Sequence, residues 1–348
     1  MTEAYQTLDP ENMLGYIDAL PDDLEKAWLL GHQLPLKAMA QPGAIIICGM
    51  GGSAIGGDLL ASYVADRCPV PIIARRDYGL PAWAEGEQVL VVCSSHSGNT
   101  EETLEAFRAA LERGCSLLAL TTGGKLRDLA VEHGTDCWIF EHEGQPRTAI
   151  PYSFGLLLAL LDRLSMVGLL DEDIADAVSV MRERRDAVGM ESGPATNPAK
   201  RLAGQLMDRN IAVFAAGELE VIARRWKTQI NELAKAWACF EGLPEMNHNT
   251  LAGLVFPESL FERTSAIFLR SKLDHPRNAL RLQASMEYFL QAGIGTDSVW
   301  ASGMSRLAQM WSLLQMGDYV SYYLALNYGV DPTPVDALSA LKQRLAHS

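Results

Sequence analysis

The stretch QVLVVCSSHSGNTEETLEAFRAALERG, residues 88–114, contains an apolar segment, a polar segment and a segment with helical periodicity in direct succession. Residues 89–93 are aliphatic or cysteine, which predicts a buried strand. Residues 101–114 have the apolar spacing of a helix and end on a glycine. Between them, residues 94–100 contain four hydroxyl side chains, one glycine and one asparagine. A turn needs only one or two polar residues, so this junction is a candidate ligand site.

Strand and helix alternate on both sides of this stretch. Short apolar segments, such as AIIICG at 44–49 and CSLLALTT at 115–122, alternate with helical segments. A helical region at 150–210 interrupts this order, which resumes at IAVFAAG, 211–217. The alternation predicts parallel strands joined by crossover helices, and therefore an α/β fold.

A chain of 348 residues with this pattern is expected to form two α/β domains. We predict N-terminal helices over 1–40, a first domain over 41–190, a second domain over 198–331 and a C-terminal helix over 332–348. The segment GMESGPATNP, 189–198, is the candidate linker. Each domain is predicted to be a mainly parallel sheet flanked by helices, a three-layer αβα arrangement.

The charge of the chain limits its partners. The sequence has 29 basic and 43 acidic residues, a formal charge of −14. Nucleic-acid binding requires a basic face, so this class of partner is not expected. An acidic protein binds an anion only through local donors, such as hydroxyl groups and backbone N–H groups.

Cysteine usage and the apolar segments indicate a cytoplasmic protein. The six cysteines show no C-x-x-C spacing, which argues against a zinc site or a redox pair. The N-terminus has neither a basic region nor an apolar region of a signal peptide. No uninterrupted apolar run reaches about 18 residues, so no membrane span is expected.

Two strand–helix junctions carry groups that bind anions. In CGMGGSAIGGD, 48–58, Gly52 lets the backbone approach a ligand, and Ser53 offers a hydroxyl group and a helix cap. The opening stretch offers Ser95, Ser97 and Thr100. Ligands of parallel sheets bind beyond the carboxyl ends of strands, where helix N-termini point. Hydroxyl and helix N–H groups together satisfy the oxygens of a phosphate, so both junctions are candidate phosphate sites.

An ordinary structural role remains open for each junction. Glycine is common after a strand, and Ser or Thr is the usual residue before a helix. Neither junction matches a nucleotide-binding loop. No Gly-Lys-Ser/Thr follows either one, and the strand after GMGGSA ends in ARRD rather than in a lone acidic residue.

Four motifs carry a resemblance to a known family. GMGGSAIGGD at 49–58 and SSHSGNTEET at 94–103 are similar to the phosphosugar-binding junctions of sugar isomerase (SIS) domains. QPRTAIPYSFG at 145–155 and QINELAKAWACFEGLPEMNHNTLAG at 229–253 resemble segments of the bifunctional phosphoglucose/phosphomannose isomerases. The resemblance implies two SIS domains and interconversion of glucose 6-phosphate or mannose 6-phosphate with fructose 6-phosphate through an enediol. It also implies a homodimer with shared active sites and no metal or organic cofactor.

The resemblance implies catalytic roles for Glu232 and His248. The family's catalytic glutamate lies in a stretch like QINE and serves as the base. His248, sixteen residues later, matches the ring-opening histidine, which in relatives reaches into the other subunit's active site. From composition alone, a surface carboxylate paired with Lys235 or Arg225 is the commoner case for Glu232, on a helix predicted over 219–238.

The resemblance adds two basic residues to the site. Arg147, in QPRTA, resembles the arginine near the phosphate, and Lys342 resembles a lysine of the C-terminal helix that completes the site. A lysine in a terminal helix is otherwise simply solvated. His96 departs from the family, where an aromatic residue such as tyrosine is expected, and His275 is interpreted as structural or interface-forming.

Two other functions remain open. The chain is alternatively a phosphosugar sensor that binds without turnover, because SIS domains also serve in regulators. It is alternatively an SIS isomerase of another sugar phosphate. Binding without turnover would favour the sensor. Turnover that is lost in Glu232→Gln while the ligand still binds would favour the isomerase.

Overall fold

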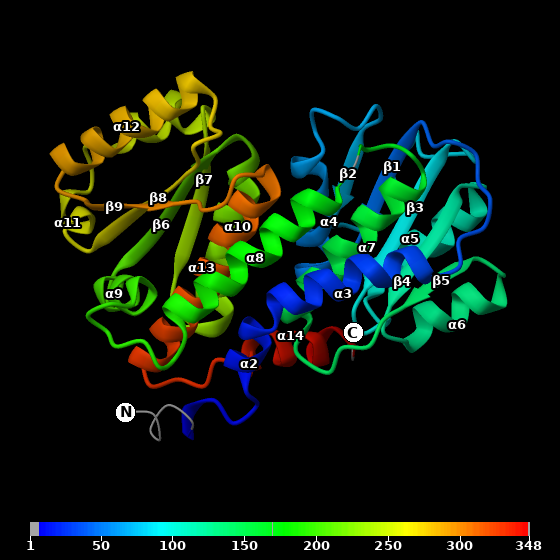
Figure 1. Ribbon diagram of the computed structural model, residues 1–348, viewed down its shortest axis with the longest axis horizontal. Coiled ribbons are helices and arrows are strands. Elements are labelled where there is room, and N and C mark those ends of the chain that lie inside the picture. Colours follow the sequence, from blue (N-terminus) through cyan, green and yellow to red (C-terminus); the bar gives the residue numbers. More distant parts are fainter. Residues whose placement is uncertain (1–6, 169, 347–348) are drawn as a thin grey trace. The chain divides into compact units, whose positions relative to one another are not determined.

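The structure is a computed structural model that describes residues 7–168 and 170–346 (Figure 1). Its internal contacts group the chain into two compact units. The first unit comprises Ala19–Ser179 with Ser305–Leu307. The second unit comprises the residues up to Asp18, Val180–Met304 and the residues from Ala308 onward. In the described part of the chain, no helix combines the length and the apolar character needed to cross a membrane.

The first unit is built on a five-stranded parallel sheet in the order β2-β1-β3-β4-β5. The strands are β1 Ala44–Cys48, β2 Ile72–Arg75, β3 Val89–Ser95, β4 Ser116–Thr121 and β5 Asp136–Ile139. Its helices are α3 Leu20–Gln33, α4 Gly51–Tyr63, α5 Glu101–Glu112, α6 Gly124–Glu132 and α7 Ile150–Arg163.

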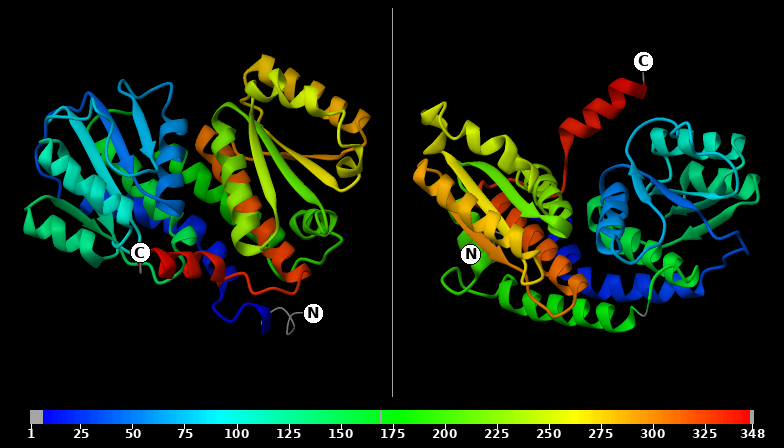
Figure 2. Two further views of the ribbon diagram at one scale, coloured as in Figure 1. Left: turned by 180° about the vertical axis from the view of Figure 1, so that it is seen from behind. Right: turned by 90° about the horizontal axis from the view of Figure 1, so that it is seen from above.

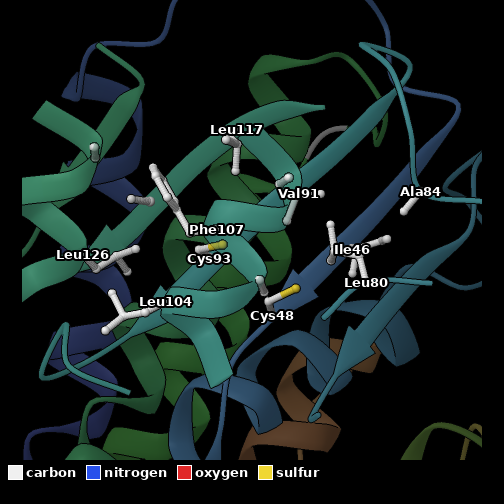
Figure 3. Packing of buried hydrophobic residues seen from close by; sticks show 14 of the residues in the cluster. Ile46, Cys48, Leu80, Ala84, Val91, Cys93, Leu104, Phe107, Leu117 and Leu126 are labelled. Carbon is white, nitrogen blue, oxygen red and sulfur yellow. The ribbon is translucent and has the colours of Figure 1, made fainter. Parts of the chain in front are cut away.

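The core of the first unit follows the alternation of side chains along its strands. Ile46, Val91 and Cys93 point to the face covered by α5, where they pack with Leu104 and Phe107 (Figure 3). Both faces of the central strand β3 are buried, which explains its uninterrupted apolar sequence. Pairing with β1 and β4 places Cys93 opposite Cys48 and Ala119, and this register sets the position of the polar loop that follows.

The second unit is built on a four-stranded parallel sheet in the order β7-β6-β8-β9. One face packs against α12, and α10 packs on β6 and β7 (Figure 2). Its strands are β6 Asn210–Ala216, β7 Ala238–Leu243, β8 Thr264–Arg270 and β9 Gly295–Trp300. The remaining helices are α2 Met13–Asp18, α8 Asp171–Val188, α9 Pro198–Gln205, α10 Glu220–Leu233, α11 Glu258–Phe261, α12 Pro276–Gln291, α13 Arg306–Asn327 and α14 Asp336–Ala346. The α/β class with helix-flanked parallel sheets is confirmed.

The prediction of one helix over 219–238 is wrong at its end. Helix α10 stops at Leu233, and Lys235 adopts a positive φ of 55°. The Asn231 side chain donates to the carbonyl oxygen of Ala236 at 2.7 Å, which closes the turn after the helix. Strand β7 then starts at Ala238 and pairs with β6. The residues around 233–238 are good helix formers, and only pairing with β6 selects the strand.

Candidate functional site

The two polar junctions lie side by side at the carboxyl edge of the first sheet. Strands β1 and β3 are parallel neighbours with Cys48 opposite Cys93. The loops that follow them therefore begin together. A Cβ atom added to Gly49 would lie 2.8 Å from the carbonyl oxygen of Ser94, so the two loops are in direct contact.

The loop from Ser94 to Thr100, here called the hydroxyl loop, holds its side chains in a network. The Ser95 and Thr100 hydroxyl oxygens are 2.8 Å apart, and Ser95 Oγ also accepts from the backbone N–H of Gly98 at 3.1 Å. Ser97 is exposed, and its Oγ accepts from the N–H of Asn99 at 3.2 Å. Thr100 occupies the N-cap position of α5 but makes no capping hydrogen bond. An ordinary N-cap role therefore does not account for this hydroxyl group.

The capping role predicted for Ser53 is wrong. Helix α4 begins at Gly51 with Met50 as its N-cap residue, so Ser53 is the third residue of the helix and is buried. The Met50 side chain has no oxygen to accept from the first helical N–H groups, and the first turn of α4 has no acidic residue. The positive end of the α4 dipole thus faces the carboxyl edge without a side-chain cap.

Gly52 brings a third segment to this edge. A Cβ atom at Gly52 would lie 2.4 Å from the carbonyl oxygen of Pro146 and 3.4 Å from Cα of Arg147. The short 3₁₀ helix η1, Pro146–Thr148, therefore packs directly on the first turn of α4. Arg147 is only 5% exposed in this position. The first unit thus brings the predicted residues Gly52 and Arg147 together.

The hydroxyl loop is locked against the loop that follows β4. Gly98 has a φ of 66°, and its carbonyl oxygen accepts from the N–H of Leu126 at 2.9 Å. Thr122 Oγ1 donates to the carbonyl oxygen of His96 at 2.7 Å. A Cβ atom at Gly98 would lie 1.8 Å from the carbonyl oxygen of Gly123, so a side chain here would have to displace backbone. Only glycine fits at this position.

Gly98→Ala is expected to lower the free energy of unfolding by about 3 kcal/mol, from positive-φ strain together with overpacking. Gly114→Ala is the matched control. Gly114 has the same φ of 66° but nothing within 4 Å of an added Cβ, so it isolates the backbone cost. That cost is about 1 kcal/mol. Urea unfolding of both variants measures the difference, and equal losses would show that the two loops do not clamp each other.

The structure reveals a polar contact that the sequence did not identify. His96 Nε2 lies 3.0 Å from His142 Nδ1, and His142 Nε2 lies 3.3 Å from Thr148 Oγ1. Burial and the neighbouring His142 lower the pKa of His96 to about 4. Burial also lowers the pKa of His142. Both imidazoles are therefore neutral at pH 7. No spacing rule relates residues 96 and 142, which meet only because β4 and β5 fold beside β3.

The lowered pKa of His96 predicts an acid-sensitive fold. The unfolded chain binds a proton at the ordinary histidine pKa of 6.5, whereas the folded chain binds it only near pH 4. The stabilisation is thus complete above pH 6.5 and is lost as the pH falls towards 4. Urea unfolding between pH 7.5 and 4.5 should show a smaller decrease for His96→Gln than for the wild type. The exposed His133 supplies the control His133→Gln, which should keep the wild-type slope.

Glu232 lies in the last turn of α10 and is half-buried. The helix is fixed in the second unit by a buried ion pair, Arg225 to Asp318 at 2.8 Å, and by Trp226 Nε1, which donates to the carbonyl oxygen of Leu313 at 2.8 Å. Arg225 is thus engaged with Asp318. The orientation of α10 is consequently rigid, which is a requirement for a positioned base.

His248 lies in the 3₁₀ helix η3, Glu245–His248, and is exposed. η3 follows the carboxyl end of β7 and is held against α12, because Asn247 Nδ2 donates to Ser285 Oγ at 2.7 Å. The start of α10 also lies at this end of β7: a Cβ atom at Gly242 would lie 2.3 Å from the Glu220 side chain.

Glu232 and His248 therefore do not meet within one chain. Glu232 is twelve residues after Glu220, about 18 Å along the α10 axis. It lies near the start of β7, and His248 lies beyond the end of that strand. The family resemblance implies a pair formed between two subunits, and the fold places the two residues near opposite ends of the same strand.

Two further predicted residues lie elsewhere in the second unit. Lys342 is an exposed residue of α14. His275 is exposed and is the N-cap of α12, where its Nδ1 accepts from the N–H of Arg277 at 3.2 Å. The structural interpretation of His275 thus agrees with its contact.

Known proteins similar to this chain share this architecture. The family model of the bacterial phospho-glucose isomerase C-terminal SIS domain matches residues 195–345. The D-glucosamine-6-phosphate 4-epimerase of Sulfolobus acidocaldarius is 30% identical over 71% of this chain and 79% of its own length. A hypothetical protein from Thermus thermophilus has the same fold, with a TM-score of 0.73 at 17% identity over 100% of this chain and 94% of that one.

One relative matches nearly the whole sequence. The bifunctional phosphoglucose/phosphomannose isomerase of Caldicellulosiruptor bescii is 40% identical over 329 residues, which are 94% of this chain and 97% of the relative. A match of this length extends through both units. The chain therefore belongs to the bifunctional phosphoglucose/phosphomannose isomerase family.

Proposed function

We propose that the protein is an aldose–ketose isomerase that interconverts glucose 6-phosphate, mannose 6-phosphate or both with fructose 6-phosphate. The observation that carries the proposal is the Ser95–Thr100 hydroxyl pair at the start of α5. These hydroxyl groups are not used as a helix cap, and they lie at the same sheet edge as the start of α4 and η1. The identity to a named isomerase supports the same conclusion.

The phosphate group is held in the first unit. Ser95, Ser97 and Thr100 donate hydroxyl hydrogens, and the backbone N–H of Gly52 and the hydroxyl group of Ser53, in the first turn of α4, add uncharged donors. Arg147, on the adjoining η1, supplies a positive charge and a bidentate geometry. This remote binding energy positions the reacting carbons without taking part in the chemistry.

The chemistry consists of proton transfers. Glu232 removes the proton from C2 to form the enediol and returns it at C1, while His248 moves a proton between O5 and O1 to open the ring. Lys342 lies near the ring oxygens. These steps need neither a metal ion nor an organic cofactor. The six cysteines are free thiols, which is consistent with the proposed cytoplasmic location.

The proposed active unit is a homodimer with shared sites. The separation of Glu232 and His248 along β7 supports this. The two side chains of one chain lie too far apart to act at one reaction centre, so a second copy has to supply His248. In the dimer, each site combines Glu232 of one protomer with His248 of the other.

A second candidate is chemistry on an amino-sugar phosphate, which the 30% identity to a D-glucosamine-6-phosphate 4-epimerase favours. The phosphate site serves either substrate class, so the difference lies in which carbon reacts. A phosphosugar sensor without turnover uses the same site and lacks the reaction.

Direct assays separate these functions. The purified protein is expected to form fructose 6-phosphate from glucose 6-phosphate, from mannose 6-phosphate or from both, in the presence of EDTA. Turnover of glucosamine 6-phosphate alone would favour the epimerase. Binding of all three compounds without turnover would favour the sensor, and loss of turnover on addition of EDTA would contradict the cofactor-free mechanism.

A further inference from the structure

His96, His142 and Thr148 form a continuous hydrogen-bonded chain, here called the histidine strap. His96 belongs to the hydroxyl loop, and Thr148 belongs to η1, directly after Arg147. His142 lies between β5 and η1 and bridges the two, at 3.0 Å from His96 and 3.3 Å from Thr148. The strap thus links two segments that both supply candidate phosphate ligands.

One arrangement of the ring protons satisfies both contacts of the strap. The Thr148 hydroxyl donates to the carbonyl oxygen of Gln145 at 2.8 Å, so in this arrangement its oxygen accepts from His142 Nε2–H. A neutral imidazole carries one N–H group. His142 Nδ1 then accepts from His96 Nε2–H.

Aromatic rings enclose the strap. The rings of Phe140 and Tyr152 stack with their centroids 5.1 Å apart. The His96 ring makes an edge contact with Phe140 at a centroid distance of 6.2 Å, and the His142 ring makes one with Tyr152 at 6.0 Å. Thr148 is 1% exposed. A hydrogen bond in such an enclosed setting is stronger than one in water, and an unmatched donor costs more.

We propose that the histidine strap positions the hydroxyl loop and Arg147 relative to each other, so that both bind the same phosphate group. His96, His142 and Thr148 are positioning residues, and they do not touch the reacting carbons. The proposal rests on the phosphate site proposed above and assigns a role to residues outside it. Without the strap, the loop and η1 keep their own folds but lose their common orientation.

Burial keeps the strap neutral despite a nearby carboxylate. Asp23 of α3 faces it through Tyr152, whose hydroxyl donates to Asp23 Oδ1 at 3.3 Å, and Lys26 balances Asp23 at 3.3 Å. The carboxylate of Asp23 raises the pKa of His142, but burial opposes this more strongly and the net shift is downward. A proton on the pair would set two N–H groups against each other between His96 and His142.

The test uses inorganic phosphate, which reports on this half of the site without any turnover. His142→Ala is expected to weaken phosphate binding about tenfold, measured as a dissociation constant by titration calorimetry at pH 7.5. His96→Gln places a non-titrating donor at the position of Nε2 and should keep binding within about twofold of the wild type. Thr148→Ser keeps the acceptor and should behave likewise, whereas Thr148→Val should bind as weakly as His142→Ala.

Steady-state kinetics provide the second measurement. His142→Ala should raise KM for the sugar phosphate about tenfold and change kcat less than about twofold, because the reacting groups are untouched. His133→Gln, at an exposed histidine of the same unit, is the control and should change neither constant. Circular dichroism and urea unfolding identify variants that fail to fold. If His142→Ala does not fold, the comparison of Thr148→Val with Thr148→Ser carries the test.

The possible results distinguish the role of the strap in phosphate binding from the proposed reaction. Weaker phosphate binding in His142→Ala and Thr148→Val, rescued in the conservative variants, supports the strap even if no sugar phosphate is turned over. Wild-type phosphate binding in a folded His142→Ala overturns it. A wild-type protein that binds no phosphate overturns the strap and the phosphate site together, and equal weakening by His133→Gln would show a nonspecific effect and overturn the strap alone.

Discussion

Glu232→Gln is expected to lower kcat about 1000-fold for either aldose phosphate, with KM changed less than about threefold. Glutamine matches the size and shape of glutamate but does not accept a proton at neutral pH, so only proton removal from C2 is affected. The proposed phosphate site lies in the first unit, so phosphate binding should persist. Steady-state kinetics and calorimetry with inorganic phosphate measure the two properties separately.

The control for this variant lies on the same helix. Glu220→Gln removes a carboxylate from the other end of α10, about 18 Å along the helix axis, and should retain kcat. If Glu232→Gln keeps a kcat within about tenfold of the wild type, Glu232 is not the base. If both variants lose activity equally, the effect belongs to the helix and not to the carboxylate.

A heterodimer of two inactive variants is expected to recover about half of the wild-type activity. His248→Ala alone should lower kcat about 100-fold, through loss of assisted ring opening. A dimer of one Glu232→Gln chain and one His248→Ala chain contains one fully intact shared site and one doubly defective site. Recovery follows only if each site takes Glu232 and His248 from different protomers.

Two affinity tags, one on each variant, allow the heterodimer to be purified after co-expression. Each homodimer serves as a control and should stay near its own low activity. A heterodimer that is no more active than the homodimers would show that each site takes both residues from one chain. A protein that sediments as a monomer while it is fully active would also contradict sharing.

Much of the first unit could be predicted from the sequence. Strand β3 is buried on both faces, so its apolar run is unambiguous, and glycine marks the end of α5 at Gly114. Parallel strands place their carboxyl ends at one edge, which allowed the two polar junctions to be placed together without any tertiary information.

In the second unit, the local sequence pattern predicts the wrong secondary structure after α10. The residues before β7 continue the composition of α10, and the strand exists only because β6 offers a partner. The separation of Glu232 from His248 depends on that strand. A helix continued to Ala238 leaves no strand between the two residues, so the expectation that His248 serves the other subunit comes from the family resemblance and not from the predicted elements.

Contacts between segments that are distant along the chain could not be predicted from the sequence either. The glycine at 52 indicates a place where a ligand approaches the backbone, and the structure shows Pro146 packed on it. The position of Ser53 after a strand indicates a helix cap, although the helix begins two residues earlier. The sequence identifies no partner for His142, because its contact to His96 spans 46 residues and has no periodic signal.

Proton exchange with solvent tests the central claim most directly, namely that Glu232 moves the C2 proton through an enediol. The protein is incubated with glucose 6-phosphate or mannose 6-phosphate in D₂O, and the C2 proton is followed by NMR. Deuterium is expected to replace hydrogen at C2 of the aldose phosphate over repeated turnovers with the wild-type protein, and Glu232→Gln is expected to abolish this exchange. Exchange at C2 that continues at the wild-type rate in Glu232→Gln would contradict the role of Glu232 as the base.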